Sequence, residues 1–163
     1  MSDAAIKALQ RALELEKSGQ AFYTQAAART ADPKGKEMFS SLADDEVMHA
    51  EVIQRQVDAL AEGKGWIVPE GIETVKADLE SPLFPASQVD LERAVQPDAS
   101  DLDALLFALK IENDSFNLYA EQARAATDPN ARHLYEYLAD AERTHFNLLM
   151  LNYEGLSSAG GFA

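Results

Sequence analysis

The chain has 163 residues, a length that suits a single domain. It contains no cysteine, which excludes disulfides, thiolate zinc sites, cysteine-ligated iron–sulfur clusters and a cysteine nucleophile. Its 14 basic and 28 acidic residues give a net charge of -14, so nucleic acid and an anionic membrane are poor partners. Because no apolar run approaches the ~20 residues of a membrane span and no signal peptide is visible, we expect a cytoplasmic protein.

The first 60 residues predict two helices. Apolar residues recur three and four positions apart, as at Leu9 and Leu13, which is the period of a helix with one buried face. The pattern breaks at Asp32-Pro33, where Asp is a good N-cap and Pro is favoured in the first helical turn. We therefore expect a second helix to begin there and to end near Gly63.

The segment 64–100 separates these helices from a second helical region. It holds four of the six prolines and the only tryptophan, Trp66. It is too long for a tight turn and too rich in proline for one straight helix, so we expect short helical turns there. The helical period then returns, breaks again at Asp128-Pro129 and ends near Gly155.

The two helical regions are copies of one another. Residues 8–53 align with 104–149 at a constant offset of 96 without a gap, and 14 of the 46 positions are identical. This repeat predicts an all-α four-helix bundle made of two antiparallel hairpins, 4–62 and 101–155. We expect the long crossover 63–100 to join them within one domain, 1–163.

Polar residues interrupt the apolar stripe of every predicted helix. Each stripe contains a glutamate, and the second and fourth add a histidine three residues later, on the same helix face. In each half the two glutamates are 30 residues apart with the turn midway, so at ~1.5 Å per residue both lie roughly 22 Å from the turn. The six residues brought to one height are Glu16, Glu46, His49, Glu112, Glu142 and His145.

Four buried carboxylates require a partner. Unpaired, they would repel one another and cost several kcal/mol. Two divalent cations would neutralise them, and carboxylate with imidazole suits Fe, Mn or Zn better than Cu(I). A single Glu-x-x-His motif is more often a solvated helix face, but its duplication in register with the other glutamates predicts a dinuclear metal site.

These motifs resemble the ferritin-like di-iron carboxylate superfamily, whose signature is a Glu from each of two helices and Glu-x-x-His from each of the other two. Within it the chain is most similar to rubrerythrin-like proteins of the single-domain, erythrin type. The resemblance implies a ferritin-like bundle holding two Fe ions, with Mn or Zn possible. It also implies that Glu16 and Glu112 are terminal carboxylates, that Glu46 and Glu142 bridge the metals, and that His49 and His145 each cap one.

The resemblance also suggests residues around the metals. Tyr23 and Tyr119 match family tyrosines that hydrogen-bond to the site, although either could be an ordinary core tyrosine. Asp44 and Asp140 are weaker candidates for such contacts, and we expect them to face solvent.

Two features depart from typical rubrerythrins. The additional glutamate that follows the ligand of the third helix by three residues is replaced by Ser115, and the matching residue in the first helix is Gly19. The iron movement linked to that glutamate is therefore not implied here. The chain also lacks the four cysteines of a rubredoxin domain, so electrons would come from a separate donor such as rubredoxin or another reductase.

The resemblance implies an oxidoreductase that reduces hydrogen peroxide or dioxygen in oxidative-stress defence, and it implies a homodimer. The alternatives are iron oxidation and storage of the bacterioferritin type, peroxide dismutation at manganese, oxidation of an organic substrate, and a metal-free helical interaction module.

Overall fold

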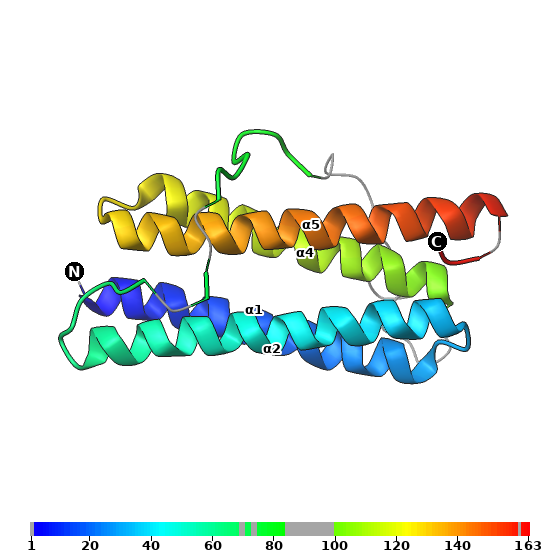
Figure 1. The fold of residues 1–163 in the computed structure, drawn as a ribbon, viewed down its shortest axis with the longest axis horizontal. Coiled ribbons are helices and arrows are strands. Elements are labelled where there is room, and N and C mark those ends of the chain that lie inside the picture. The colour runs from blue at the N-terminus through cyan, green and yellow to red at the C-terminus, as the bar shows by residue number, and fades with distance from the viewer. Residues whose placement is uncertain (1, 69–70, 73–74, 84–99, 160) are drawn as a thin grey trace.

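The described part of the chain forms four long helices, which lie side by side as a bundle (Figure 1). The computed structural model describes residues 2–68, 71–72, 75–83, 100–159 and 161–163. The helices are α1 (Ser2–Arg29), α2 (Pro33–Ala61), α4 (Asp101–Ala125) and α5 (Pro129–Ala159), and no strand occurs among the described residues. The predicted all-α, ferritin-like four-helix bundle is therefore confirmed.

The helices pair as two antiparallel hairpins. α1 packs along α2, α4 packs along α5, and α1 contacts α4 between the hairpins. The end of α1 lies beside the start of α4, where the hydroxyl of Thr30 donates to the carboxylate of Asp101 at 3.0 Å. The crossover must therefore return along the bundle, and the second hairpin runs antiparallel to the first (Figure 1).

The Asp-Pro breaks begin a helix in the same way in both halves. The carboxylate of Asp32 accepts from the backbone N–H groups of Lys34 and Gly35, at 2.8 and 3.3 Å. The carboxylate of Asp128 likewise accepts from the backbone N–H groups of Asn130 and Ala131, at 2.8 and 3.3 Å. Each carboxylate thus satisfies N–H groups that have no partner within the helix.

The apolar core lies on either side of a polar layer. One cluster contains Tyr23, Phe39 and Leu105, and the other contains Leu9 and Phe116 with their neighbours. Along each helix the residues of the two clusters are separated by the stripe glutamate. Since burial of a large apolar side chain contributes roughly 1.5–3 kcal/mol, these clusters fix the height at which the glutamates meet.

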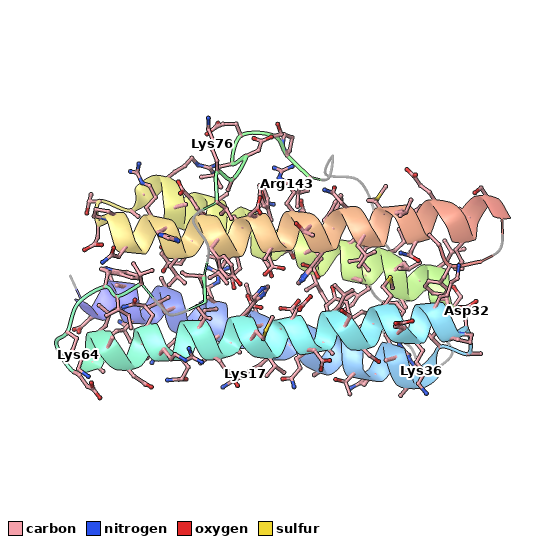
Figure 2. The ribbon with its side chains drawn as sticks, viewed as in Figure 1. Lys17, Asp32, Lys36, Lys64, Lys76 and Arg143 are labelled. Atoms are coloured by element: carbon pink, nitrogen blue, oxygen red, sulfur yellow. The ribbon has the colours of Figure 1, made fainter. Side chains whose placement is uncertain are left out.

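The described part of the crossover contains no helix, and residues 84–99, where further helical turns were expected, lie outside the described residues. Residues 75–83 lie against the second hairpin. The guanidinium of Arg143 donates to the carbonyl oxygens of Asp78 and Ser81, both at 2.6 Å (Figure 2). Arg124 donates to the carbonyl of Leu79 at 2.8 Å. Hydrogen bonds from two arginine side chains to backbone carbonyls therefore attach this part of the crossover to α4 and α5.

Candidate metal centre

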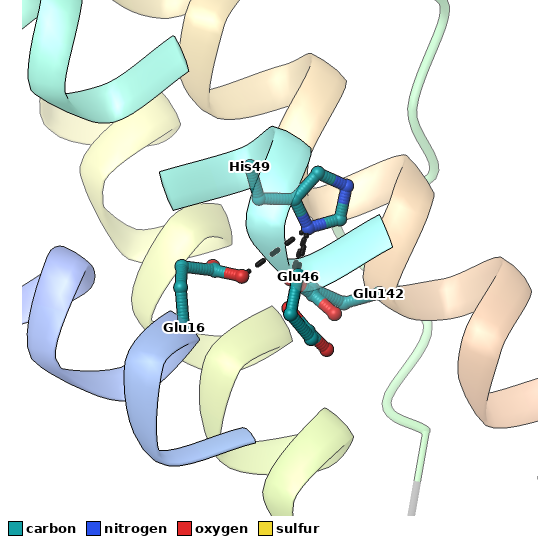
Figure 3. Close-up of side chains that lie close together, drawn as sticks. All are labelled: Glu16, Glu46, His49 and Glu142. Carbon is teal, nitrogen blue, oxygen red and sulfur yellow. Dashed lines mark hydrogen bonds and ion pairs between the residues drawn. The ribbon is translucent and has the colours of Figure 1, made fainter. Parts of the chain in front are cut away.

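The six polar residues predicted from the sequence lie together inside the bundle. None exposes more than 6% of its surface. Figure 3 shows four of them converging from three helices: Glu16 from α1, Glu46 and His49 from α2, and Glu142 from α5. The polar interruptions of the apolar stripes are thus buried and face one another.

One group of ligand atoms surrounds the imidazole of His49. Its Nδ1 lies 3.2 Å from Glu16 Oε2, 3.5 Å from Glu46 Oε2 and 3.5 Å from Glu142 Oε1 (Figure 3). Three carboxylates from three helices therefore face a single ring nitrogen.

The second group surrounds His145 in the same manner. Its Nδ1 lies 3.5 Å from Glu112 Oε2, 3.4 Å from Glu142 Oε2 and 3.8 Å from Glu46 Oε1. Glu46 and Glu142 thus turn one oxygen toward each imidazole. The result is two adjacent groups, each with three carboxylates and one histidine, that share two glutamates.

Several buried polar atoms of the cluster are ones that a cation could satisfy. Buried polar atoms in proteins almost always have hydrogen-bond partners. Among the described residues, four buried atoms of this cluster have none: Glu112 Oε2, both carboxylate oxygens of Glu142 and His145 Nδ1. This oxygen and nitrogen donor set suits Fe, Mn or Zn, and the cluster could hold a metal.

Without a metal the cluster must bind protons. Burial and repulsion from Glu142 raise the pKa of Glu46 to about 11, and the same causes raise the pKa of Glu112. Burial lowers the pKa of His49 and His145, but the surrounding carboxylates outweigh it and raise both. The neighbouring Glu112 and the two histidines outweigh burial and lower the pKa of Glu142. Metal binding must therefore displace protons.

Two tyrosines connect the hairpins at the cluster. The hydroxyl of Tyr23 donates to Glu112 Oε1, and that of Tyr119 donates to Glu16 Oε1. Each tyrosine thus reaches across to the glutamate of the other half and leaves that glutamate's Oε2 facing a histidine. Burial and the charge of the accepting glutamate raise the pKa of both phenols, so they remain donors.

The sequence analysis missed a carboxylate that orients a histidine. Asp45 Oδ2 lies 3.2 Å from His145 Nε2, and this hydrogen bond lowers the pKa of Asp45. Asp44, considered instead, is exposed, and Asp140 is half-buried. The available signal was an acidic residue directly before a ligand glutamate, but the repeat obscured it because the matching residue is Ala141.

Small residues lie beside the shared glutamates. Gly19 is buried, and a Cβ atom added to it would lie 3.5 Å from the carboxylate of Glu46, an ordinary contact. Ser115, at the matching position in α4, is also buried. Neither position supplies the additional carboxylate of typical rubrerythrins.

The fold and the two ligand groups define a ferritin-like bundle with a candidate dinuclear metal centre. A family model described as Rubrerythrin matches residues 7–153, and the chain therefore belongs to the rubrerythrin family of that superfamily. No curated protein and no solved structure matches the chain significantly. Among the described helices, none has an apolar stretch that could cross a bilayer.

Proposed function

We propose that the protein is a non-haem di-iron oxidoreductase that reduces hydrogen peroxide or dioxygen, as a rubrerythrin-like peroxidase in oxidative-stress defence. The observation that carries this proposal is the sharing of Glu46 and Glu142 between two buried ligand groups. This sharing would place two ions side by side, where one O–O bond can reach both.

Each residue of the cluster has a role in this proposal. Glu46 and Glu142 would hold both ions, Glu16 and His49 would bind one of them, and Glu112 and His145 would bind the other. A bound iron pair supplies two electrons and Lewis acidity for O–O cleavage.

The chain's own groups hold the ligands in place, exclude water and retain protons. Tyr23 and Tyr119 each fix one oxygen of a terminal glutamate, which keeps the other oxygen directed at the ions. The two phenolic protons are held at Glu112 Oε1 and Glu16 Oε1, which belong to carboxylates of the candidate centre. The apolar clusters on either side keep bulk water out, and Gly19 leaves space beside Glu46.

The reaction needs an electron source outside this chain. Without cysteine the sequence cannot form a rubredoxin domain, so we propose a separate donor, rubredoxin or another reductase. We further propose that the protein works as a cytoplasmic homodimer.

Anaerobic iron loading followed by peroxide addition tests the function. We expect two Fe(II) per chain by metal analysis, and one hydrogen peroxide consumed for each iron pair oxidised. The Glu46→Gln/Glu142→Gln variant should bind no stoichiometric iron and serves as the control. Oxidation no faster than that of iron in buffer would contradict the proposal. Uptake of many irons per chain, together with a large cage by light scattering, would favour storage instead.

A further inference from the structure

A chain of three aromatic rings leads away from the candidate centre. Tyr119, which donates to Glu16, stacks on Tyr135 with ring centroids 6.4 Å apart and planes inclined by 26°. Tyr135 meets Trp66 edge to face, with centroids 5.8 Å apart and planes inclined by 63°. The three rings therefore connect a candidate metal ligand to the crossover at one end of the bundle.

A second chain of rings leads toward the other end. Tyr23, which donates to Glu112, stacks on Phe39 at 6.2 Å and 23°. Phe39 meets Phe162 edge to face at 6.2 Å and 79°. The offset of 96 that relates the two halves of the sequence also relates the rings of the two chains, pairwise: Tyr23 and Tyr119, Phe39 and Tyr135, Phe162 and Trp66.

The two chains share their geometry but differ in chemistry and in exposure. Tyrosine and tryptophan can lose one electron to a strong oxidant, whereas phenylalanine is far harder to oxidise. Trp66 is half-buried and lines a groove of about 580 Å³ with Ala5 and Tyr135. Phe162 is only 6% exposed. Of the two chains of rings, only the one that ends in Trp66 thus has a terminal ring that can be oxidised and that solvent can reach.

We propose that Tyr119, Tyr135 and Trp66 form an electron-transfer path that carries oxidising equivalents from the metal centre to the surface. The path acts when a hydroperoxide reacts at the centre and no reductant is available, and it rests on the proposed function. Electrons move inward from Trp66, and the oxidation ends at a side chain outside the metal cluster.

The chemistry balances for hydrogen peroxide as oxidant. An electron leaves Tyr119 for the centre while its phenolic proton passes to Glu16, to which it is already hydrogen-bonded. Trp66 replaces that electron, the proton returns from Glu16, and the indole proton goes to solvent. A second pass and addition of water give hydroxylated Trp66. Trp66 thus gives up two electrons and two protons, and these reduce hydrogen peroxide to two waters.

Tyr135 serves as a bridge in this path. Its hydroxyl is buried and has no hydrogen-bond partner among the residues that the structure describes, and burial raises its pKa to about 12. A phenol with no acceptor cannot easily release its proton, so the radical does not rest there. The path therefore requires the Tyr135 ring and not its hydroxyl.

The first test compares Trp66 oxidation in matched variants. Iron-loaded protein is treated with excess hydrogen peroxide without reductant, and peptide mass spectrometry measures oxygen addition at Trp66. We expect it in the wild type and in Tyr135→Phe, and its loss in Tyr135→Leu. Phe39→Leu, the matched change in the other half, should retain it. Equal oxidation in Tyr135→Leu, or none in the wild type, would overturn the path.

The second test needs no metal. Azide radicals generated by pulse radiolysis oxidise the single tryptophan, and its radical then oxidises Tyr119 through the same rings, so that the electron crosses the path in the reverse direction. Conversion of the indolyl to the tyrosyl absorption should be lost in Tyr119→Phe, slowed in Tyr135→Leu and kept in Tyr135→Phe. Conversion that does not depend on Tyr135 would overturn the path. If conversion depends on Tyr135 but iron-loaded protein does not react with peroxide, the path is supported and the proposed function is wrong.

Discussion

The two halves of the bundle have the same candidate ligands but different surroundings. His145 Nε2 is hydrogen-bonded to Asp45, whereas Ala141 stands at the position that would serve His49 by the repeat. His49 instead has the ring of Tyr137 edge-on at 6.4 Å. The residues that would contact metal are thus duplicated, and the side chains that contact the two histidines have diverged.

The crossover adds a second difference between the halves. Arg143, which anchors the crossover, also lies over the ring of Phe116, 4.6 Å from its centroid. The matching residues of the first half are Val47 and Gln20, which cannot form this contact. Arg143 therefore fixes residues 78–81 over the α4–α5 hairpin, and a separate hydrogen bond from the Asn130 side chain to the carbonyl of Trp66, at 3.1 Å, holds the start of the crossover against α5.

The largest expected effect is the loss of metal binding when a shared glutamate is replaced, and it would show whether the two halves form one site. Glu46→Gln or Glu142→Gln removes a carboxylate that both ligand groups share, so either change should abolish binding of both ions. Glu16→Gln should weaken one ion much more than the other. Metal analysis after gel filtration measures this, with exposed Glu14→Gln as control. Retention of one ion in Glu46→Gln would contradict the shared-ligand geometry.

Core substitutions compare the middle rings of the two aromatic chains. Phe39 is fully buried, so Phe39→Ala should lower the free energy of unfolding by about 3–5 kcal/mol. Tyr135→Phe should instead be neutral or stabilising by up to about 1–3 kcal/mol, because it removes a buried hydroxyl that has no partner in the described part of the chain. Urea unfolding of metal-free protein measures both changes. A strongly destabilised Tyr135→Phe would mean that the hydroxyl has a partner.

The pH dependence involves a carboxylate from each half. The raised pKa values of Glu46, about 11, and of Glu112 mean that both hold protons at neutral pH without metal. Apparent metal affinity should therefore fall as pH falls, about tenfold per pH unit for each proton displaced. Proton release into weakly buffered solution on adding Fe(II) measures it. No release at pH 7 would contradict these protonation states.

The same pKa shift has a consequence for stability. Between the ordinary pKa of Glu46, 4.5, and its folded value of about 11, the folded metal-free protein binds more protons than the unfolded chain. The stabilising contribution of this proton is present below the unfolded pKa and is lost as pH rises through the folded one. Metal-free protein should therefore become less stable on the alkaline side, as urea unfolding across pH would detect.

The histidine partners distinguish the two metal positions. Asp45→Ala removes the acceptor of His145 and should weaken one ion about 10–100-fold, leaving the other less affected. Ala141→Asp offers His49 the matching acceptor and should bring the two affinities closer. Calorimetric titration with Fe(II) resolves the two steps, and exposed Asp44→Ala is the control. Equal weakening of both steps by Asp45→Ala would show that the positions are coupled.

The smallest expected effect concerns the helix caps, where the halves agree. Asp32→Ala and Asp128→Ala each remove a carboxylate that accepts from two backbone N–H groups at matching distances. Each should lower the free energy of unfolding by about 1 kcal/mol. Urea unfolding that gave clearly unequal losses would show that the first turns of α2 and α5 are not equivalent.

The sequence by itself determined the helices, the hairpin pairing and the height of the polar layer. Helical period, Asp-Pro caps and a gapless repeat are local signals, and they fixed where Glu16 and Glu46 would meet because the rise per residue is constant. The sequence also predicted that the charged residues within the apolar stripes are buried, because their positions follow the same helical period. The resemblance to the ferritin-like superfamily rested on that spacing.

Only the tertiary structure decided which side chains support the cluster. The bonds from Tyr23 to Glu112 and from Asp45 to His145 join different hairpins, so they depend on how the hairpins pack. The neighbours of Trp66 were likewise undetermined, because a crossover without helical period has no fixed direction. Periodicity reports which face of a helix is buried, whereas packing of separate elements selects the partner that each buried group meets.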